Sequence, residues 1–411
     1  MVLNRINKKN KLIILITLLV LLVIFYITLV ILNLQLVNKY KNQVMPNIYL
    51  EDLELSDFSY SKAKERIQYY NDNVLTKTVK LKVNENEYEY PIKEIGLFID
   101  VDKSFQQIDS YQKRLNYSEK LMLLHGRTNK KFKFVYTSDV GKLTETINTL
   151  KAKVDKGAID GHFNTEGNIS YTKGVNGYTL DVNKSVEEIN KNINTEYKEG
   201  IVVNLVGDVI QANGNDSYAT IDTMTSSFVT EFRPNTYLRN INLNTALRYI
   251  NGSVVEPGQV FSYCDKAGPF DKAGYVFYYE FVGNGVCQIA TTTYNAALLG
   301  GLEIVKRYPH DKKSLYVAGG LDATVASYSS GWCVDMQFKN TYKYPIYIRA
   351  YSEGGRAHVE FWSNSNAKEG KEYKTSWTQI GQRGYRTFLH TYQNGQEIAV
   401  NEIATTWYPK D

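Results

Sequence analysis

The feature that most constrains this chain is an uninterrupted apolar run near its start. Residues 12–32 read LIILITLLVLLVIFYITLVIL, close to the roughly 20 residues that a helix needs to cross a hydrocarbon core of about 30 Å. The run therefore predicts a transmembrane helix. Four basic residues precede it, and by the positive-inside rule they place residues 1–11 in the cytoplasm: Arg5, Lys8, Lys9 and Lys11. Everything after about residue 33 is then expected to be extracytoplasmic.

A cleaved signal peptide is the alternative interpretation of the same run. The run is long for the apolar part of a signal peptide, and no Ala-x-Ala cleavage site follows it. We therefore expect a single-pass anchor in the cell membrane, followed by a short polar stalk over residues 33–45.

The rest of the composition narrows the classes of function. With 411 residues, two or three folded units are expected. The net charge is only +5 and no long basic block occurs, so nucleic acid is not an expected partner. No cofactor is expected. No metal site is expected either, because four of the five histidines are scattered without ligand spacing: His125, His162, His358 and His390.

The chain has three cysteines, Cys264, Cys287 and Cys333. An odd number in an exported chain leaves at least one thiol unpaired within the monomer, and no CxxC motif suggests zinc. Cys264 and Cys333 can pair and leave Cys287 free, or all three can be reduced. The spacing does not decide between these two states.

Residues 46–212 contain an internal repeat. Residues 96–108 read GLFIDVDKSFQQI and residues 177–189 read GYTLDVNKSVEEI. Each predicts a strand that ends at Asp-Val and a helix that opens at Lys-Ser, with Asp102 or Asn183 available as the N-cap. We predict two small α+β units, over about 46–130 and 131–212. Chance similarity between two strand-to-helix turns is the alternative.

This half of the chain resembles the peptidoglycan-binding repeats that precede VanW domains in bacterial surface proteins. The resemblance rests on residues 48–64, 95–108, 158–161, 167–171 and 177–189. No nucleophile or acid pair in it has a recognisable spacing, so binding is a better expectation than catalysis.

The chemistry of the chain is concentrated in residues 282–310, VGNGVCQIATTTYNAALLGGLEIVKRYPH. Cys287 follows a glycine turn and opens a predicted helix, whose N-terminus favours a thiolate. His310 follows the helix after a predicted return strand and is a candidate base, and Asp322 in GGLDATV is a candidate to orient it. The alternative is a buried cysteine, a surface-turn histidine and an aspartate that caps the chain.

Other residues around Cys287 are candidates for binding substrate or an oxyanion. The backbone amides of Val286, Cys287 or Gln288, beside Gly285, are candidates for an oxyanion hole. The side chains of Gln288, Thr291 and Thr292 either contact substrate or satisfy local backbone groups.

The second half of the chain resembles a VanW domain. The resemblance rests on NGSVVEPGQVFSY, AGPFDKAGYV, GNGVCQIATTTYNAALLGGLEIVKRYPH, GGLDATV and NTYKYPIYIRAY, in this order over about residues 235–363. It departs from the family at Asn284, which stands in a run that is usually three glycines. We place the VanW domain at 213–364, as a mixed α+β fold with a largely antiparallel C-terminal sheet. A β-rich extension over 365–411 resembles the short end of a G5-type module.

The resemblance implies a cell-wall enzyme. VanW domains are associated with glycopeptide-resistance loci and, in clostridial-type relatives, with L,D-transpeptidase activity that forms 3-3 cross-links. It implies that Cys287 attacks a peptidoglycan stem peptide, with cell-wall synthesis proteins as further candidate partners. The alternatives are a papain-like cysteine peptidase that hydrolyses stem peptides, and a non-catalytic peptidoglycan-binding scaffold or glycopeptide-resistance accessory protein.

Overall fold

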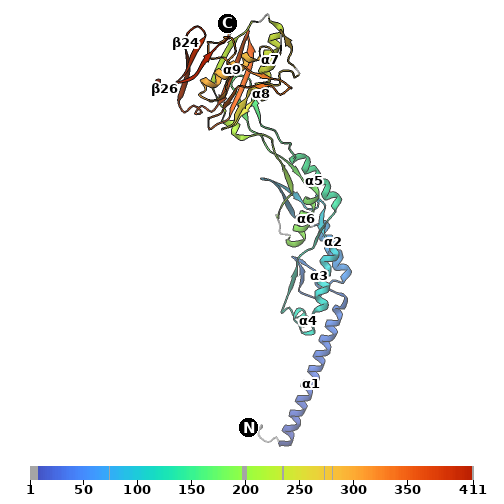
Figure 1. The fold of residues 1–411 in the computed structure, drawn as a ribbon. Helices are drawn as coiled ribbons and strands as arrows, with labels where there is room; N and C mark the ends of the chain where they lie inside the picture. The colour runs from blue at the N-terminus through green and yellow to red at the C-terminus, as the bar shows by residue number, and fades with distance from the viewer. Residues whose placement is uncertain are drawn as a thin grey trace. The chain divides into compact units, whose positions relative to one another are not determined.

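The computed structural model describes residues 8–73, 75–196, 201–233, 236–272, 274–279 and 281–409. The chain forms two compact units (Figure 1). The first comprises the chain up to residue 157 together with 177–210, and the second comprises 158–176 together with the chain from residue 211. Both mix helices with strands, and the sheets of the C-terminal part are antiparallel, so the predicted α+β class is confirmed.

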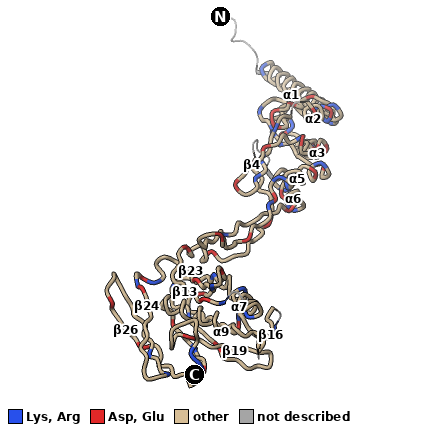
Figure 2. Tube along the Cα trace, turned by 90° about the horizontal axis from the view of Figure 1, so that it is seen from above, with Lys and Arg blue, Asp and Glu red and all other residues tan. Residues whose placement is uncertain are grey.

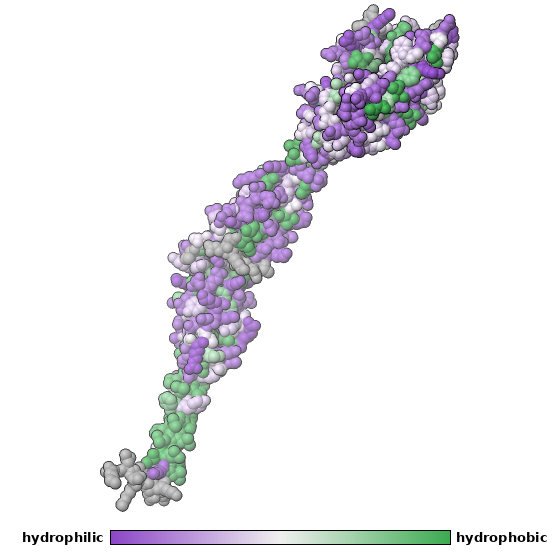
Figure 3. All heavy atoms as spheres, turned by 90° about the vertical axis from the view of Figure 1, so that its left-hand side faces the viewer, coloured by the Kyte–Doolittle hydropathy of each residue, from purple (hydrophilic) through white to green (hydrophobic). Residues whose placement is uncertain are grey.

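The apolar run forms one long helix, α1 (Lys8–Lys39). Within α1 and the turn after it, residues 10–42 are long and apolar enough to cross a membrane, and their most apolar window buries none of its surface inside the protein. Figure 3 shows the helix as a continuous hydrophobic surface. A helix of this kind near the N-terminus is a candidate membrane anchor or signal sequence.

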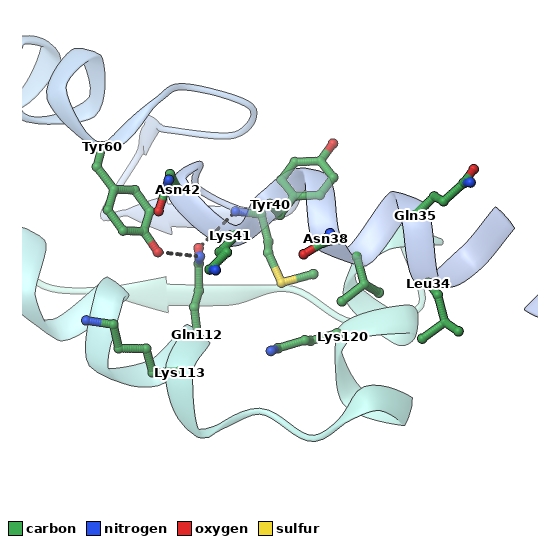
Figure 4. Close-up of a pocket in the computed structure, with 12 residues that line it drawn as sticks. Leu34, Gln35, Asn38, Tyr40, Lys41, Asn42, Tyr60, Gln112, Lys113 and Lys120 are labelled. Atoms are coloured by element: carbon green, nitrogen blue, oxygen red, sulfur yellow. Dashed lines mark hydrogen bonds between the residues drawn. The ribbon is translucent and has the colours of Figure 1, made fainter. Parts of the chain in front are cut away.

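The predicted polar stalk at 33–45 is wrong for its second half. After α1 a short 3₁₀ turn, η1 (Tyr40–Asn42), leads into the fold, and Tyr40, Val44 and Met45 are buried in the core of the first unit. Met45 N donates to Gln112 Oε1 at 2.9 Å, and Figure 4 shows these residues lining a pocket with the end of α1. Apolar side chains at 44 and 45 are removed from water, which favours packing over a free linker.

The first unit contains six α-helices and ten strands in its described residues. After α1 its helices are α2 (Tyr60–Asn73), α3 (Val101–Arg114), α4 (Tyr117–Leu124), α5 (Val140–Val154) and α6 (Val182–Glu196). Its strands are β1 (Ile48–Leu50), β2 (Leu53–Glu54), β3 (Thr78–Val83), β4 (Asn86–Pro91), β5 (Leu97–Ile99), β6 (Lys130–Phe132), β7 (Tyr136–Ser138), β10 (Gly177–Leu180), β11 (Val202–Asn204) and β12 (Gly207–Ile210).

These strands do not separate at residue 130, as the predicted pair of repeats would require. β11 pairs parallel with β3 in a sheet of order β11-β3-β4, and β6 pairs parallel with β1. A strand from the second repeat thus completes a sheet of the first. One hydrophobic cluster, from Tyr40 to Leu205, is shared by both, so neither repeat encloses a core of its own.

The repeated strand-to-helix turn is nevertheless present in three dimensions. The N-cap of α3 is Asp100, which accepts from Lys103 N at 2.9 Å, and in the second copy Asp181 accepts from Lys184 N at 3.0 Å. The caps therefore lie two residues before the predicted Asp102 and Asn183. The reason is that each helix begins directly at the valine of Asp-Val. The aspartate before it is then the cap, and Asp100 has the extended backbone that a cap needs.

The serine of each copy makes the same tertiary bond. Ser104 accepts from Val135 N at 2.9 Å, and Ser185 accepts from Val206 N at 3.1 Å. Each therefore ties the first turn of its helix to a distant strand or loop. This shared bond supports a true repeat over chance similarity.

A third copy of the turn was not predicted. Residues 139–147, DVGKLTETI, share Asp, Val, Lys and the final Ile with the other two, and Asp139 caps α5 by accepting from Lys142 N at 3.1 Å. The lysines and aspartates of such turns belong to the mixed basic and acidic residues that Figure 2 shows along these helices. Exposed charge pairs of this kind contribute little stability.

The second unit is built around the helix α9 (Val286–Leu299). Its other helices are η2 (Asp216–Thr220), α7 (Tyr237–Ile250) and α8 (Tyr263–Ala267). Its strands are β8 (His162–Asn164), β9 (Ser170–Thr172), β13 (Thr223–Glu231), β14 (Val254–Val255), β15 (Val260–Ser262), β16 (Phe277–Tyr278), β17 (Phe281–Val282), β18 (Glu303–Lys306), β19 (Ala326–Ser327), β20 (Cys333–Val334), β21 (Gln337–Lys339), β22 (Ile346–Glu353), β23 (Arg356–Ser363), β24 (Lys371–Ile380), β25 (Gly384–Gln393) and β26 (Gln396–Trp407).

Helix α9 packs on an antiparallel sheet of order β13-β23-β22-β14. Most residues of this helix are buried, because strands and loops cover it on several sides. A second sheet, β15-β21-β18, carries the return strand β18 that leads towards His310.

Two peripheral segments belong to the second unit. The hairpin β8-β9 packs there through Phe163, whose ring centroid lies 4.5 Å from that of Tyr347, so residues 158–176 lie outside the first unit to which the prediction assigned them. The extension after residue 364 forms the antiparallel meander β24-β25-β26, and β24 contacts α9. The predicted strands of the extension are confirmed.

Candidate active site

Cys287 lies in the first turn of α9, behind two glycines with left-handed backbone. Gly283 has φ +76°, and Gly285, the N-cap of α9, has φ +108°, conformations that residues with a side chain rarely adopt. The thiol is half-buried against residues 324–325: Sγ lies 3.3 Å from Val325 O and accepts from Val325 N at 3.4 Å. The carbonyl suits a neutral thiol and the amide suits a thiolate.

His310 is held by Asp322 through two bonds. The carboxylate Oδ2 accepts from the backbone N of His310 at 2.7 Å and lies 2.7 Å from its Nδ1. Asp322 is 0% exposed, whereas the side chain of His310 keeps 24% of its surface exposed. Because Nδ1 is engaged by the carboxylate, Nε2 is the ring nitrogen left to interact with Cys287.

The electrostatics of the site favour an ionised Cys287. Burial opposes ionisation of the thiol, but hydrogen bonding and charge interaction with His310, aided by Val325 N and the Thr324 hydroxyl, lower its pKa overall. Burial would also lower the pKa of His310, yet the bond to Asp322 and the interaction with Cys287 raise it to about 9. Both shifts favour a thiolate and imidazolium pair.

Two residues that the sequence analysis missed complete the surroundings of Asp322. Arg307 Nη2 donates to Asp322 Oδ1 at 3.1 Å and its Nε donates to the backbone oxygen of Asp322 at 2.6 Å. The hydroxyl of Tyr408 donates to the same Oδ1 and accepts from Gly320 N at 2.8 Å. Burial would raise the pKa of Asp322, but the bonds from His310 and Tyr408, with the charge of Arg307, lower it.

The sequence carried a weak signal for one of these residues. Arg307 follows β18 and stands three residues before His310, so a basic residue beside the candidate base was visible. Tyr408 lies 86 residues after Asp322 in the sequence, directly after β26 of the C-terminal meander. Nothing local to Tyr408 indicates its partner.

Three side chains predicted near the substrate make structural bonds instead. Thr291 is fully buried, donates to Ala323 O at 3.1 Å and accepts from Ala323 N at 2.9 Å. Thr292, also fully buried, donates to Gln288 O at 2.7 Å. Gln288 donates to Glu231 O at 2.8 Å. The local alternative therefore holds for Thr291 and Thr292, because no surface of either is open to a ligand.

The amides proposed for an oxyanion hole differ in availability. Val286 N donates to Gly283 O at 3.2 Å, and Gln288 N donates to Gly285 O at 3.0 Å. Among the described residues, the amide of Cys287 has no such backbone acceptor. Of the three candidates, Cys287 N is thus the one available to an incoming oxyanion.

A groove of about 870 Å³ lies beside the first turn of α9, at Gln288, the residue after Cys287. It lies between the end of β13, the start of α7, the first turn of α9 and the loop after β18, and its wall includes Arg239, Gln288 and Tyr316. Burial and the neighbouring charge of Cys287 raise the pKa of Tyr316, which places this phenol close to the thiol. A ligand in the groove would thus lie near the cysteine, which directly precedes the lining residue Gln288.

The other two cysteines lie together at a separate place. All three thiols are free; Cys264 is buried, whereas Cys333 is exposed. Burial is the main cause that raises the pKa of Cys264, and hydrogen bonding with Cys333 adds to it. The expectation that these two can pair while Cys287 stays free is compatible with their adjacency, and in the structure they are reduced.

Two family models match separate parts of the chain. The one described as "VanW like protein" matches residues 238–362, and the one described as "Putative peptidoglycan binding domain" matches residues 88–202. The second match crosses residue 130, in keeping with the shared core of the repeats.

One curated relative is "Uncharacterized protein YoaR" of Bacillus subtilis (strain 168). It is 34% identical over 148 residues, which cover 33% of this chain and 47% of that protein. The match thus spans about half the length of the curated relative. No solved structure matches the chain significantly. Residues 238–362, which contain Cys287, His310 and Asp322, form a VanW-like domain, and with the peptidoglycan-binding region at 88–202 they mark a cell-wall-related protein.

Proposed function

We propose that this protein is a cysteine acyltransferase that acts on peptidoglycan stem peptides, as an L,D-transpeptidase that forms 3-3 cross-links. The observation that carries the proposal is the arrangement of Cys287, His310 and Asp322, with a thiol pKa lowered by the adjacent histidine. A nucleophile, a base and a group that orients the base are the parts that acyl transfer through a thioester requires.

In the first half-reaction the thiolate of Cys287 attacks the carbonyl of the third residue of a tetrapeptide stem. The amide of Cys287 stabilises the oxyanion of the tetrahedral intermediate. Protonated His310 donates its Nε2 proton to the leaving nitrogen as the C–N bond breaks. D-Alanine departs, and a thioester with Cys287 remains.

In the second half-reaction the side-chain amine of a neighbouring stem attacks the thioester. Neutral His310 removes a proton from this amine, the C–S bond breaks, and the thiolate leaves. Asp322 keeps Nδ1 engaged throughout, so that the same ring nitrogen gives and takes the proton. The product is a 3-3 dimer, and the enzyme returns to its starting state.

The groove beside Cys287 and the peptidoglycan-binding region support this substrate class. We further propose that α1 anchors the protein in the cell membrane with residues 1–11 in the cytoplasm, so that both units face the wall. In this position cell-wall synthesis proteins would be its neighbours and candidate partners.

The test is a product assay with the full-length protein in detergent. Purified protein is incubated with disaccharide-tetrapeptide, and the products are measured by mass for wild type, Cys287→Ala and the control Cys333→Ala. We expect a 3-3 dimer and free D-alanine from wild type and from Cys333→Ala, and neither from Cys287→Ala.

The other outcomes separate the rival functions. Shortened monomers without dimers would mean that water resolves the thioester and that the protein is a cysteine peptidase. Equal product from wild type and Cys287→Ala would exclude Cys287 as the nucleophile. No product from any form would favour a wall-binding scaffold.

A further inference from the structure

Arg239, on the first turn of α7, is a half-buried cation in the wall of the groove. Burial lowers the pKa of its guanidinium, but an arginine stays protonated in proteins. A full positive charge is therefore kept in a partly desolvated place beside Cys287. Such a charge needs anionic or strongly polar partners.

Among the described residues, Arg239 has one hydrogen-bond partner, which is neutral, and the charge of the nearby Cys287 thiol also acts on its guanidinium. Its Nη2 donates to Gln288 Oε1 at 2.8 Å. Gln288 is 1% exposed, and its amide nitrogen donates to Thr230 Oγ1 at 3.0 Å and to Glu231 O at 2.8 Å. These bonds fix the direction of the glutamine amide, so its oxygen points at the arginine. The guanidinium is thus held in place through one of its five N–H groups.

No carboxylate of the described part of the chain forms an ion pair with Arg239. The acidic residue of the groove wall, Glu231, forms an ion pair with Arg356 at 3.2 Å. Arg233 adds a second positive charge to the wall. The groove therefore offers an excess of positive charge to a ligand.

The surrounding shape fits a peptide. A Cβ at Gly285 would lie 2.9 Å from Cγ of Arg239, so the glycine before Cys287 leaves the space that this side chain occupies. Leu315, 97% exposed, stands at the groove as an apolar contact for a ligand. Nε and Cζ of Arg239 lie 3.4 and 3.6 Å from the same Cβ position at Gly285, so the cation is close to the start of α9, where Cys287 lies.

We propose that Arg239 binds a carboxylate of the donor peptide next to the bond that Cys287 attacks, and that Gln288 positions its guanidinium for this contact. This inference rests on the proposed acyl-transfer function. The two sources of such a carboxylate are the C-terminus of the peptide, which leaves with D-alanine, and the side chain of the third residue. Fork-shaped, bidentate pairing with a carboxylate is the contact that an arginine makes best.

The experiment compares three donor peptides on the full-length protein: the tetrapeptide with both carboxylates free, its C-terminal amide, and the peptide amidated on the third residue's side chain. The protein forms are wild type, Arg239→Gln, Arg239→Lys and the control Arg386→Gln, an exposed arginine of the C-terminal meander. KM and kcat are measured for each pair.

With the free acid we expect Arg239→Gln to raise KM about 10- to 100-fold, the range for a lost charge-assisted pair, while Arg386→Gln leaves KM unchanged. Wild type should show the same rise with one of the two amides, and Arg239→Gln should no longer distinguish that amide from the acid. The amide that behaves in this way identifies the carboxylate. Arg239→Lys should recover part of the affinity, since it keeps the charge without the fork.

If wild type shows the same KM for both amides as for the free acid, the inference is overturned without any mutation, while acyl transfer remains intact. If no form makes product, binding of the three peptides to Cys287→Ala and to Cys287→Ala/Arg239→Gln is measured by calorimetry. Binding that depends on Arg239 and on one carboxylate would support the inference although the proposed function had failed. Equal binding of all three peptides would overturn it.

Discussion

At the scale of single residues, the buried carboxylate of Asp322 is where the polar groups of the site meet. It accepts from His310, Arg307 and Tyr408, and this satisfies a charge that burial alone would make costly. The imidazole it holds is the group that lowers the pKa of Cys287. The ionisation of the thiol therefore depends on residues that do not touch it.

The reactivity of the thiol should follow this dependence. In wild type the pKa of Cys287 is lowered and that of His310 is raised to about 9, so the thiolate forms below the usual pH range of a cysteine. His310→Gln removes the cation, and we expect the midpoint of the pH dependence of alkylation by iodoacetamide to move upward. The rate at Cys287 is read by peptide mass in the full-length protein.

Acyl transfer should respond differently from alkylation at high pH. Alkylation needs only the thiolate and should stay on a plateau, whereas the leaving group also needs protonated His310, so acyl transfer should fall as pH rises through about 9. Coincident midpoints in wild type and His310→Gln would contradict the coupling of the two residues.

The sequence predicted the three central residues but not the rest of the site. Cys287 carries a local signal, since the glycine turn and the helix start surround it, and His310 and Asp322 follow in short motifs. Thr291 and Thr292 carry the same polar signal as substrate ligands, yet their partners are the buried carbonyls of Ala323 and Gln288. Which polar group faces a ligand depends on such distant partners.

At the scale of elements, the C-terminal meander is part of the site although it follows the residues matched by the VanW family model. The meander brings Tyr408 to Asp322 and Gly320, and Thr406 accepts from Arg307 Nη1 at 3.0 Å. β26 pairs with β25 just before Tyr408, and the register of this pair sets which residue reaches the carboxylate of Asp322.

Tyr408→Phe should reveal this contribution. Tyr408 is 3% exposed, and the loss of its hydroxyl leaves Gly320 N without its acceptor. We expect the free energy of unfolding to fall by about 1–3 kcal/mol, the usual penalty for a buried group left unpaired. We also expect slower acyl transfer, because the carboxylate loses a bond that holds it in place, and a higher pKa for His310, because Asp322 with one donor fewer interacts more strongly with the imidazolium.

Tyr392→Phe is the matched control on the same meander, since its hydroxyl bonds to Glu397 and not to the site. Denaturant unfolding and the pH profile of acyl transfer are compared for both variants. If the Tyr408→Phe protein loses stability but keeps the wild-type pH profile, the tyrosine contributes only to packing.

The sequence predicted most elements because their signals are local. The β-rich extension over 365–411 and the helix whose first turn contains Cys287 follow alternation, turns and helical spacing. The polar stalk was mispredicted because Val44 and Met45 are too few to show a period, and the partner of Met45, Gln112, is 67 residues away. Caps were misplaced by two residues, the usual difficulty at helix ends.

At the scale of the whole molecule, the proposed membrane topology places both units on the outer side. Cys333 is an exposed thiol of the second unit and serves as a natural reporter. In intact cells that produce Cys287→Ala, we expect a membrane-impermeant maleimide to label Cys333, and we expect Cys287→Ala/Cys333→Ala to remain unlabelled because Cys264 is buried. Labelling that requires broken cells would contradict this topology.

Domain boundaries were the least predictable level of organisation. The repeats share motifs, which suggested a division at residue 130, but β11 joins the sheet of β3 across more than 100 residues. The hairpin over 158–176 likewise belongs to the second unit through its aromatic contacts with Tyr347 and Tyr218. Long-range strand pairing and aromatic packing leave no periodic pattern in the sequence.

The central claim is that Cys287 forms a thioester with a stem peptide, and intact-protein mass measures it most directly. Full-length protein is mixed with disaccharide-tetrapeptide, quenched in acid within seconds and weighed. Wild type should gain the mass of the donor minus D-alanine, the gain should disappear with hydroxylamine, and peptide mapping should place it on Cys287. An unmodified wild-type protein that still yields 3-3 dimers, or an equal mass gain in Cys287→Ala, would contradict the account.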